Sequence, residues 1–189
     1  NALKIQPHCV QATYEIALSY LAMKDFQNAL KFSTDVINTN DKQLSPGAYA
    51  VKSEALVEMG KVDDALTLLY EGLSKFGDEY ILHFNMAVNY YKKGDIDKTL
   101  EHVKKAIDLD KSHSDAFLLY AYVLNDKGLW VQSILSMQMF LLLEPDIERS
   151  KNAFEEMLQA MRITKTEKPI ARSFIQQQMM HNEAGTRLH

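Results

Sequence analysis

Three glycines lie at equal intervals along this chain, with Gly60, Gly94 and Gly128 each 34 residues apart. Each glycine follows one segment in which apolar residues recur with a helical spacing, and precedes another such segment. Because glycine accepts the left-handed backbone conformation that ends many helices, each position marks the turn of a helical hairpin. A fixed period of this length indicates a chain built from copies of one supersecondary unit.

Aligning the chain on these glycines brings further columns into register and adds a copy before Gly60, with Lys24 in the glycine column. The first helix of each hairpin carries a small residue, at Ala17, Ser53, Ala87 and Ala121. The second helix carries another, at Ala29, Ala65, Thr99 and Ser133. Small side chains let two antiparallel helices approach closely where they cross. The sequence therefore predicts four stacked helix pairs, near residues 10–43, 46–79, 80–113 and 114–145.

This pattern resembles the tetratricopeptide repeat (TPR) family, a 34-residue helix–turn–helix unit. The best match is residues 80–113, where the family's signature columns hold Ala87, Tyr90, Gly94, Asp95, Thr99, Ala106 and Leu109. Pro145 also stands where the family favours proline at the end of a unit. The resemblance covers roughly residues 10–145 and implies an all-α fold, a right-handed superhelical solenoid of antiparallel helix pairs.

The two ends of the array are expected to differ from the repeats. We expect the array to occupy residues 1–162 and to finish with a capping helix at 146–162, started by Asp146. Its buried face is predicted to hold Ile147, Phe154, Met157, Leu158 and Met161. Its exposed face is predicted to hold Arg149, Asn152, Glu155, Glu156 and Gln159.

Two further segments carry their own expectations. Ser45-Pro46 is predicted to start a helix, with the serine as its cap. Residues 163–189 form a polar tail in which 170–180 has the pattern of a short helix. Disorder of this tail, folding back onto the array, and docking in a neighbouring molecule's groove all remain open.

Composition narrows the classes of function. Residues 1–148 hold 14 Lys/Arg against 21 Asp/Glu, and such an acidic body disfavours nucleic-acid binding. No apolar run reaches the roughly 18 residues of a membrane span. Cys9 is the only cysteine, so no disulfide can form within one chain. The lack of an export signal favours a cytoplasmic location, which the sequence otherwise leaves undetermined.

No catalytic constellation is evident. His83, His102 and His113 lack the i, i+4 spacing of a helical zinc site, and no glycine-rich phosphate loop occurs. We therefore expect no catalytic residue, no metal and no cofactor, and a protein that is not an enzyme.

The resemblance implies that the first helix of each pair lines a concave groove that binds a partner protein. The predicted lining is Tyr14, Leu18, Leu21, Glu54, Val57, Glu58, Phe84, Val88, Tyr91, Lys92, Leu118, Tyr122, Asn125 and Asp126. These positions lack the lysine–asparagine clamp with which some members hold acidic chaperone tails. An amphipathic helix or peptide with some positive charge fits better. The chain is thus expected to be a scaffold or adaptor. The alternatives for the protein are a self-assembling module that forms a homo-oligomer and a targeting domain of a larger enzyme. The alternative for the predicted lining is that part of it is buried between neighbouring units or covered by the chain's own tail.

Overall fold

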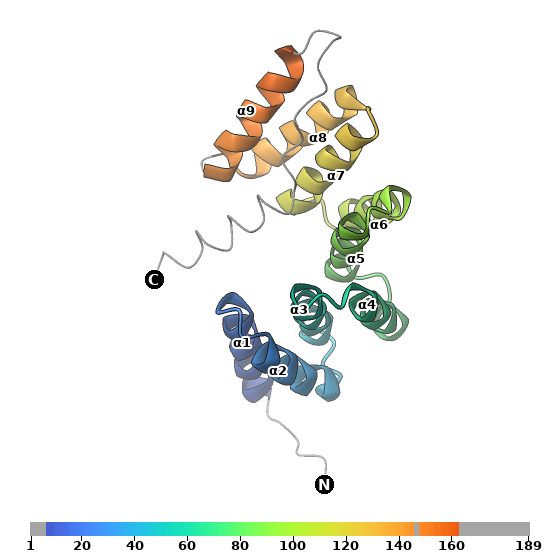
Figure 1. Cartoon of the computed structure of the whole chain (residues 1–189). Coiled ribbons are helices and arrows are strands. Elements are labelled where there is room, and N and C mark those ends of the chain that lie inside the picture. The colour runs from blue at the N-terminus through green and yellow to red at the C-terminus, as the bar shows by residue number, and fades with distance from the viewer. Residues whose placement is uncertain (1–6, 146–147, 163–189) are drawn as a thin grey trace. The chain divides into compact units, whose positions relative to one another are not determined.

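The computed structural model describes residues 7–145 and 148–162, and within them the chain forms nine α-helices and no strand (Figure 1). The helices are α1 (Pro7–Ala22), α2 (Phe26–Thr39), α3 (Ser45–Glu58), α4 (Val62–Phe76), α5 (Tyr80–Lys93), α6 (Ile96–Leu109), α7 (Ser114–Asp126), α8 (Trp130–Leu143) and α9 (Glu148–Arg162). The predicted all-α repeat of helix pairs is confirmed. The expected short helix at 170–180 lies outside the described residues, as does the expected cap Asp146.

The helices fall into two compact units, Asn1–Lys93 and Gly94–His189. In the first unit, α3 packs against α1, α2, α4 and α5. In the second unit, α7 packs against α6 and α8, and α9 packs against α8. The boundary falls at Gly94, the turn between α5 and α6.

The turn glycines adopt the conformation for which the sequence selects them. Gly60, Gly94 and Gly128 have φ angles of +78°, +77° and +75°. Lys24, in the same column, is also left-handed with φ of +60°, although it carries a side chain. Behind Gly60, the Lys61 N–H donates to the carbonyl of Leu56 over 2.9 Å, which closes the end of α3.

The small-residue columns lie at the helix crossings, as predicted. Ala17, Ser53, Ala87 and Ala121 are all fully buried. Gly72 of α4 is buried for the same reason, since a Cβ there would lie 3.2 Å from Tyr49 Cγ and from a methyl carbon of Leu82. Close approach of three helices therefore explains a glycine that helix propensity alone disfavours.

Polar contacts join neighbouring repeats at defined columns. In the first unit, the buried Asn89 amide donates to the hydroxyl of Ser53 over 3.0 Å. Lys93 pairs with Asp63 over 2.6 Å. In the second unit, Lys127 and Asp97, each 34 residues later, pair over 2.7 Å. The 34-residue repeat is therefore seen in an exposed ion pair as well as in the apolar packing.

The predicted serine cap of α3 is wrong. Ser45 is the first helical residue, its hydroxyl is buried, and it makes no hydrogen bond to the described residues. No side chain of the described residues caps α3, and the Asp41 carboxylate instead accepts the N–H groups of Gln43 and Leu44, each over 2.9 Å, in the turn that precedes the helix. The helix therefore begins one residue earlier than the proline suggested.

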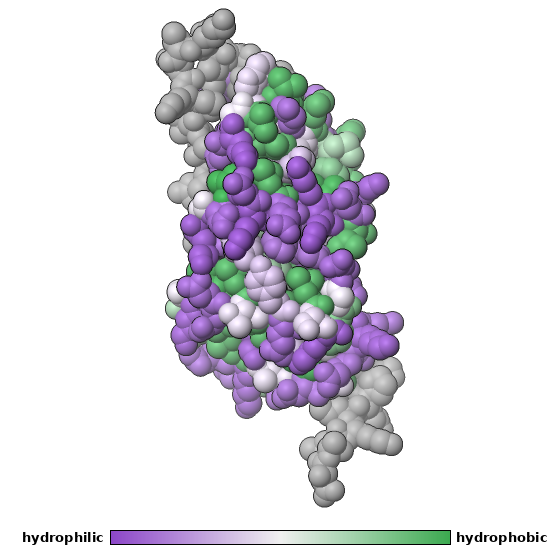
Figure 2. Space-filling view, turned by 90° about the vertical axis from the view of Figure 1, so that its right-hand side faces the viewer, coloured by the Kyte–Doolittle hydropathy of each residue, from purple (hydrophilic) through white to green (hydrophobic). Residues whose placement is uncertain are grey.

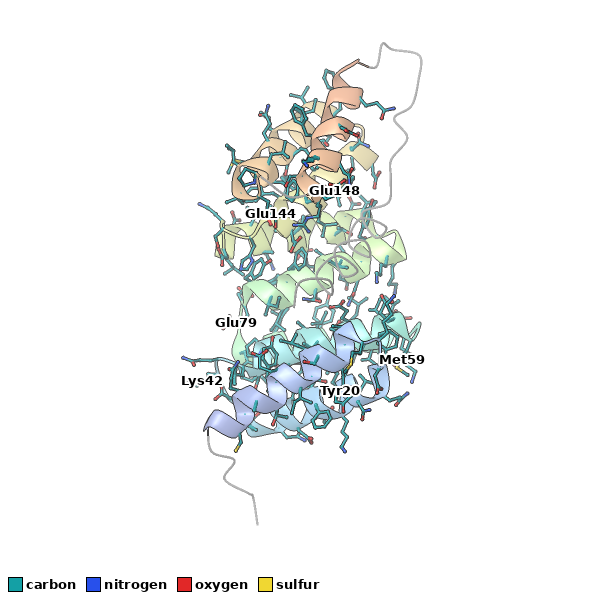
Figure 3. All side chains as sticks on the ribbon, turned by 90° about the vertical axis from the view of Figure 1, so that its left-hand side faces the viewer. Tyr20, Lys42, Met59, Glu79, Glu144 and Glu148 are labelled. Atoms are coloured by element: carbon teal, nitrogen blue, oxygen red, sulfur yellow. The ribbon has the colours of Figure 1, made fainter. Side chains whose placement is uncertain are left out.

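The predicted faces of α9 are wrong at two residues, although Glu155 and Gln159 are exposed as expected. Arg149, expected on the exposed face, is 7% exposed, whereas Phe154, expected in the core, is 46% exposed. The Arg149 guanidinium donates to Asp115 of α7 and to Glu144 beyond α8, and lies 5.0 Å from the buried Phe140 ring. Figure 3 labels Glu144 and Glu148 at this junction. Three partners from outside α9 therefore bury a residue that helical periodicity assigned to solvent.

Candidate protein-binding face

Three first helices form a continuous packed layer in the first unit. The middle helix, α3, packs against both α1 and α5 (Figure 3). We call the exposed side of this layer, with its predicted lining residues on α1, α3 and α5, the α1–α3–α5 face. This face is the part of the predicted groove that belongs entirely to the first unit.

Burial divides the predicted lining residues into two groups. Five are buried and contribute mainly to packing: Val57, Phe84, Val88, Leu118 and Tyr122. Nine remain at least partly exposed: Tyr14, Leu18, Leu21, Glu54, Glu58, Tyr91, Lys92, Asn125 and Asp126. Only this second group offers surface to a partner without rearrangement. Sequence periodicity could not separate the groups, because it identifies a helix side but not the depth of each side chain.

Tyr14 joins α1 to α3. A Cβ at Gly47 of α3 would lie 2.5 Å from the Tyr14 hydroxyl oxygen, so the end of the ring lies directly over this glycine. Burial, together with the charge of Glu15, raises the pKa of the Tyr14 hydroxyl. Tyr14 therefore packs against α3 and remains only partly exposed on the α1–α3–α5 face.

Glu54, Glu58 and Lys92 form the polar part of this face. Glu54 and Glu58 are one turn apart on α3, and Lys92 of α5 pairs with Glu58 over 3.2 Å. Glu54 is partly buried and makes no hydrogen bond within the described part of the chain. Burial raises the pKa of Glu54, Lys92 opposes that rise, and Glu58 adds to it.

The second unit contributes one predicted lining helix, α7. Leu118 is 1% and Tyr122 is 5% exposed, so both belong to the interior. Asn125 is half-buried and Asp126 is exposed. Of the predicted lining residues of α7, only the two at the polar end of the helix therefore reach the surface.

The described residues offer no metal centre, since no group of three His, Cys, Asp or Glu side chains is placed to hold an ion. No helix among them is both long and apolar enough to cross a membrane.

Comparison with known proteins supports the repeat assignment. Residues 80–113, which comprise α5, α6 and the Gly94 turn, match the family model described as "Tetratricopeptide repeat". The chain is built on the tetratricopeptide repeat. No curated protein matches the chain by sequence.

Solved structures show the same fold. A thermophilic TPR protein from Thermus thermophilus matches with a TM-score of 0.70 and 20% identity over 86% of each chain. A TPR protein from Parabacteroides merdae matches with a TM-score of 0.59 and 14% identity, over 79% of this chain and 60% of that one. The MamA protein matches with a TM-score of 0.58 and 11% identity over 95% of each chain. The TPR fold is generally a non-catalytic protein–protein interaction module, so it implies protein partners.

Proposed function

We propose that this TPR chain is a non-enzymatic scaffold or adaptor that binds an amphipathic segment of a partner protein on the α1–α3–α5 face. The observation that carries the proposal is Glu54, a partly buried carboxylate without a hydrogen-bond donor on a face that is otherwise largely apolar. A ligand that supplies a cation or an N–H group to this carboxylate would offset the cost of its burial.

The neighbouring charges favour a basic ligand residue. Lys92 is the nearest cation on the face, but its ammonium group is already paired with Glu58. Two carboxylates therefore share one lysine, which leaves the site with a net negative charge. A lysine or arginine of the ligand is the complementary group, and it would fix the ligand's orientation.

The apolar part of the face indicates which apolar residues the ligand should carry. Leu18 and Leu21 are both partly exposed and lie three residues apart on α1. A helix lying on such a face presents apolar residues at i, i+3 and i+4, in the usual manner of helix-in-groove binding. The preferred ligand is thus a short amphipathic helix with apolar anchors and one basic residue.

A display library of random helical peptides, selected on the full chain, tests this proposal. We expect selected peptides to combine a helical apolar stripe with Lys or Arg. One such peptide is then titrated against the wild type, Glu54→Gln and Leu21→Ser. Each substitution should weaken binding about tenfold, or about 1.4 kcal/mol.

Glu101→Gln is the matched control, because Glu101 is an exposed carboxylate on α6 and lies outside the proposed face. It should leave the affinity unchanged. A selection without binders, or peptides that bind all four proteins equally well, would exclude the α1–α3–α5 face as the binding site.

A further inference from the structure

The outer side of α8 is unusually apolar. Val131, Leu135, Met139 and Leu142 recur at helical spacing and are 50%, 57%, 40% and 74% exposed. We call these four residues the α8 stripe. Within residues 130–143 there is no charged side chain. Figure 2 shows hydrophobic surface (green) at the upper end of the molecule, at the height where α7 to α9 lie in Figure 1.

The repeat supplies an internal comparison for this stripe. The same four columns in the earlier second helices are polar and exposed throughout. They hold Gln27, Lys31, Asp35 and Asn38 in α2, Asp63, Thr67, Glu71 and Ser74 in α4, and Asp97, Glu101, Lys105 and Asp108 in α6. This side of the unit is therefore normally a solvated surface, and only α8 carries an apolar one.

Packing within the unit does not require the apolar residues of the stripe. The opposite side of α8 faces α7, where Ser133 and Ser136 donate to the carbonyls of Ala121 and Phe117 over 2.7 and 2.8 Å. Met137 and Phe140 are buried on that side. An apolar stripe at positions that the other copies keep polar is the signature of a docking surface.

We propose that the α8 stripe binds residues 170–180 of the same chain. In that segment Ile170, Phe174, Ile175 and Met179 fall within one half of a helical wheel, with Arg172, Ser173 and Gln176 on the other side. The apolar side matches the stripe in chemical character, and the polar side would face solvent.

The dimensions of the chain agree with this occupant. The stripe runs from 131 to 142, about 16 Å along the axis, and eleven helical residues from 170 to 180 also span about 16 Å. The connection after α8 is short and α9 packs back against α8, so α9 ends near the start of the stripe. The seven residues 163–169 can extend for about 23 Å, which exceeds the roughly 10 Å between packed helices.

Tethering also favours this occupant over a second copy of the chain. A short flexible connection gives an effective concentration in the millimolar range, well above the concentration at which most proteins are present. Even a weak contact between 170–180 and the stripe is therefore favoured within one chain over the same contact between two chains.

The single tryptophan provides the test, since Trp130 adjoins the stripe and is 57% exposed. Acrylamide quenching of Trp130 is measured in the full chain, in an Ile170→Asp/Phe174→Asp variant and in a Gln176→Glu control. We expect protection from quenching in the wild type and the control, and loss of that protection in the double variant. Leu135→Glu, at an exposed stripe position, should cause the same loss while the helical circular dichroism stays unchanged.

Two results would overturn the proposal. Quenching that is the same in the wild type and in the Ile170→Asp/Phe174→Asp variant would show that 170–180 does not cover the stripe. Protection that grows with chain concentration, together with a dimer in light scattering, would assign the stripe to a second copy instead.

Discussion

Arg149 is the residue whose substitution should most selectively release α9. Its guanidinium binds Asp115 and Glu144, with Nε 3.2 Å from a Glu144 oxygen, and lies over the Phe140 ring. Burial lowers the pKa of Arg149, but the two carboxylates more than offset this, and the net shift is upward. Arg149→Met keeps an unbranched side chain that reaches about as far as Nε of arginine, and removes the charge and all of the donors.

The expected loss follows from these contacts. A hydrogen bond to a charged group contributes about 1.5–3 kcal/mol, and a partly buried cation–π contact about 0.5–2 kcal/mol. Asp115 and Glu144 keep 36% and 25% of their side-chain surface, so water can partly replace the arginine. We therefore expect Arg149→Met to weaken the docking of α9 by about 2–4 kcal/mol.

Hydrogen exchange measured by mass spectrometry localises the effect. A loss of about 2–4 kcal/mol raises the opening equilibrium of α9 about 30- to 700-fold, because each 1.4 kcal/mol is a factor of ten. Amides of 148–162 should exchange faster by that factor, whereas those of α3 and α4 should not change. Lys151→Met, on the exposed side of α9, is the control and should have little effect. If exchange in α9 is unchanged, or rises equally in α3, then Arg149 does not hold α9 in place.

Three further substitutions test other parts of the structure. Lys24→Gly should stabilise the chain by about 0.5–1 kcal/mol in denaturant titration, because φ of +60° strains a residue with a Cβ; an unchanged midpoint would contradict this. Gly72→Ala should destabilise it by about 1 kcal/mol despite the better helix propensity of alanine, since the new methyl would crowd the buried Tyr49 and Leu82; a higher melting temperature would show that this crossing yields. Glu54→Gln should stabilise the free chain at neutral pH. The pKa of Glu54 is raised on folding, so its ionised form costs stability above the folded-state pKa, and the gain should fade as pH falls through that range; a gain that persists in acid would contradict this explanation.

Much of the fold could be predicted from the sequence because each turn and each helix crossing recurs in several copies at the same spacing. The left-handed turns at Gly60, Gly94 and Gly128 and the buried crossings at Ala17 and Ala87 follow from a spacing that few other folds produce. One copy alone would not have distinguished these positions from ordinary helix ends and core residues.

The errors concern residues whose surroundings come from other helices. Arg149 has a polar side chain at a position that periodicity assigns to solvent, and only the approach of Asp115 and Glu144 buries it. Ser45 has the right residue type for a cap, but α3 already begins at Ser45, whose hydroxyl is buried and makes no hydrogen bond to the described residues. The lining of the α1–α3–α5 face stays a prediction, because helical spacing gives the direction of a side chain and not whether a neighbour covers it.

The hydrogen bond between Asn89 and Ser53 makes the order of the repeats matter. In the column of Ser53 the other copies hold alanine, at Ala17, Ala87 and Ala121. Next to any of these, the buried Asn89 amide would lose its acceptor, at a cost of about 1–3 kcal/mol. The third copy is thus matched to the second and not to the others. A chain in which whole repeats are duplicated, deleted or permuted would lose stability at this contact, although the 34-residue period gives no sign of it. The copies therefore share one shape but cannot be exchanged for one another.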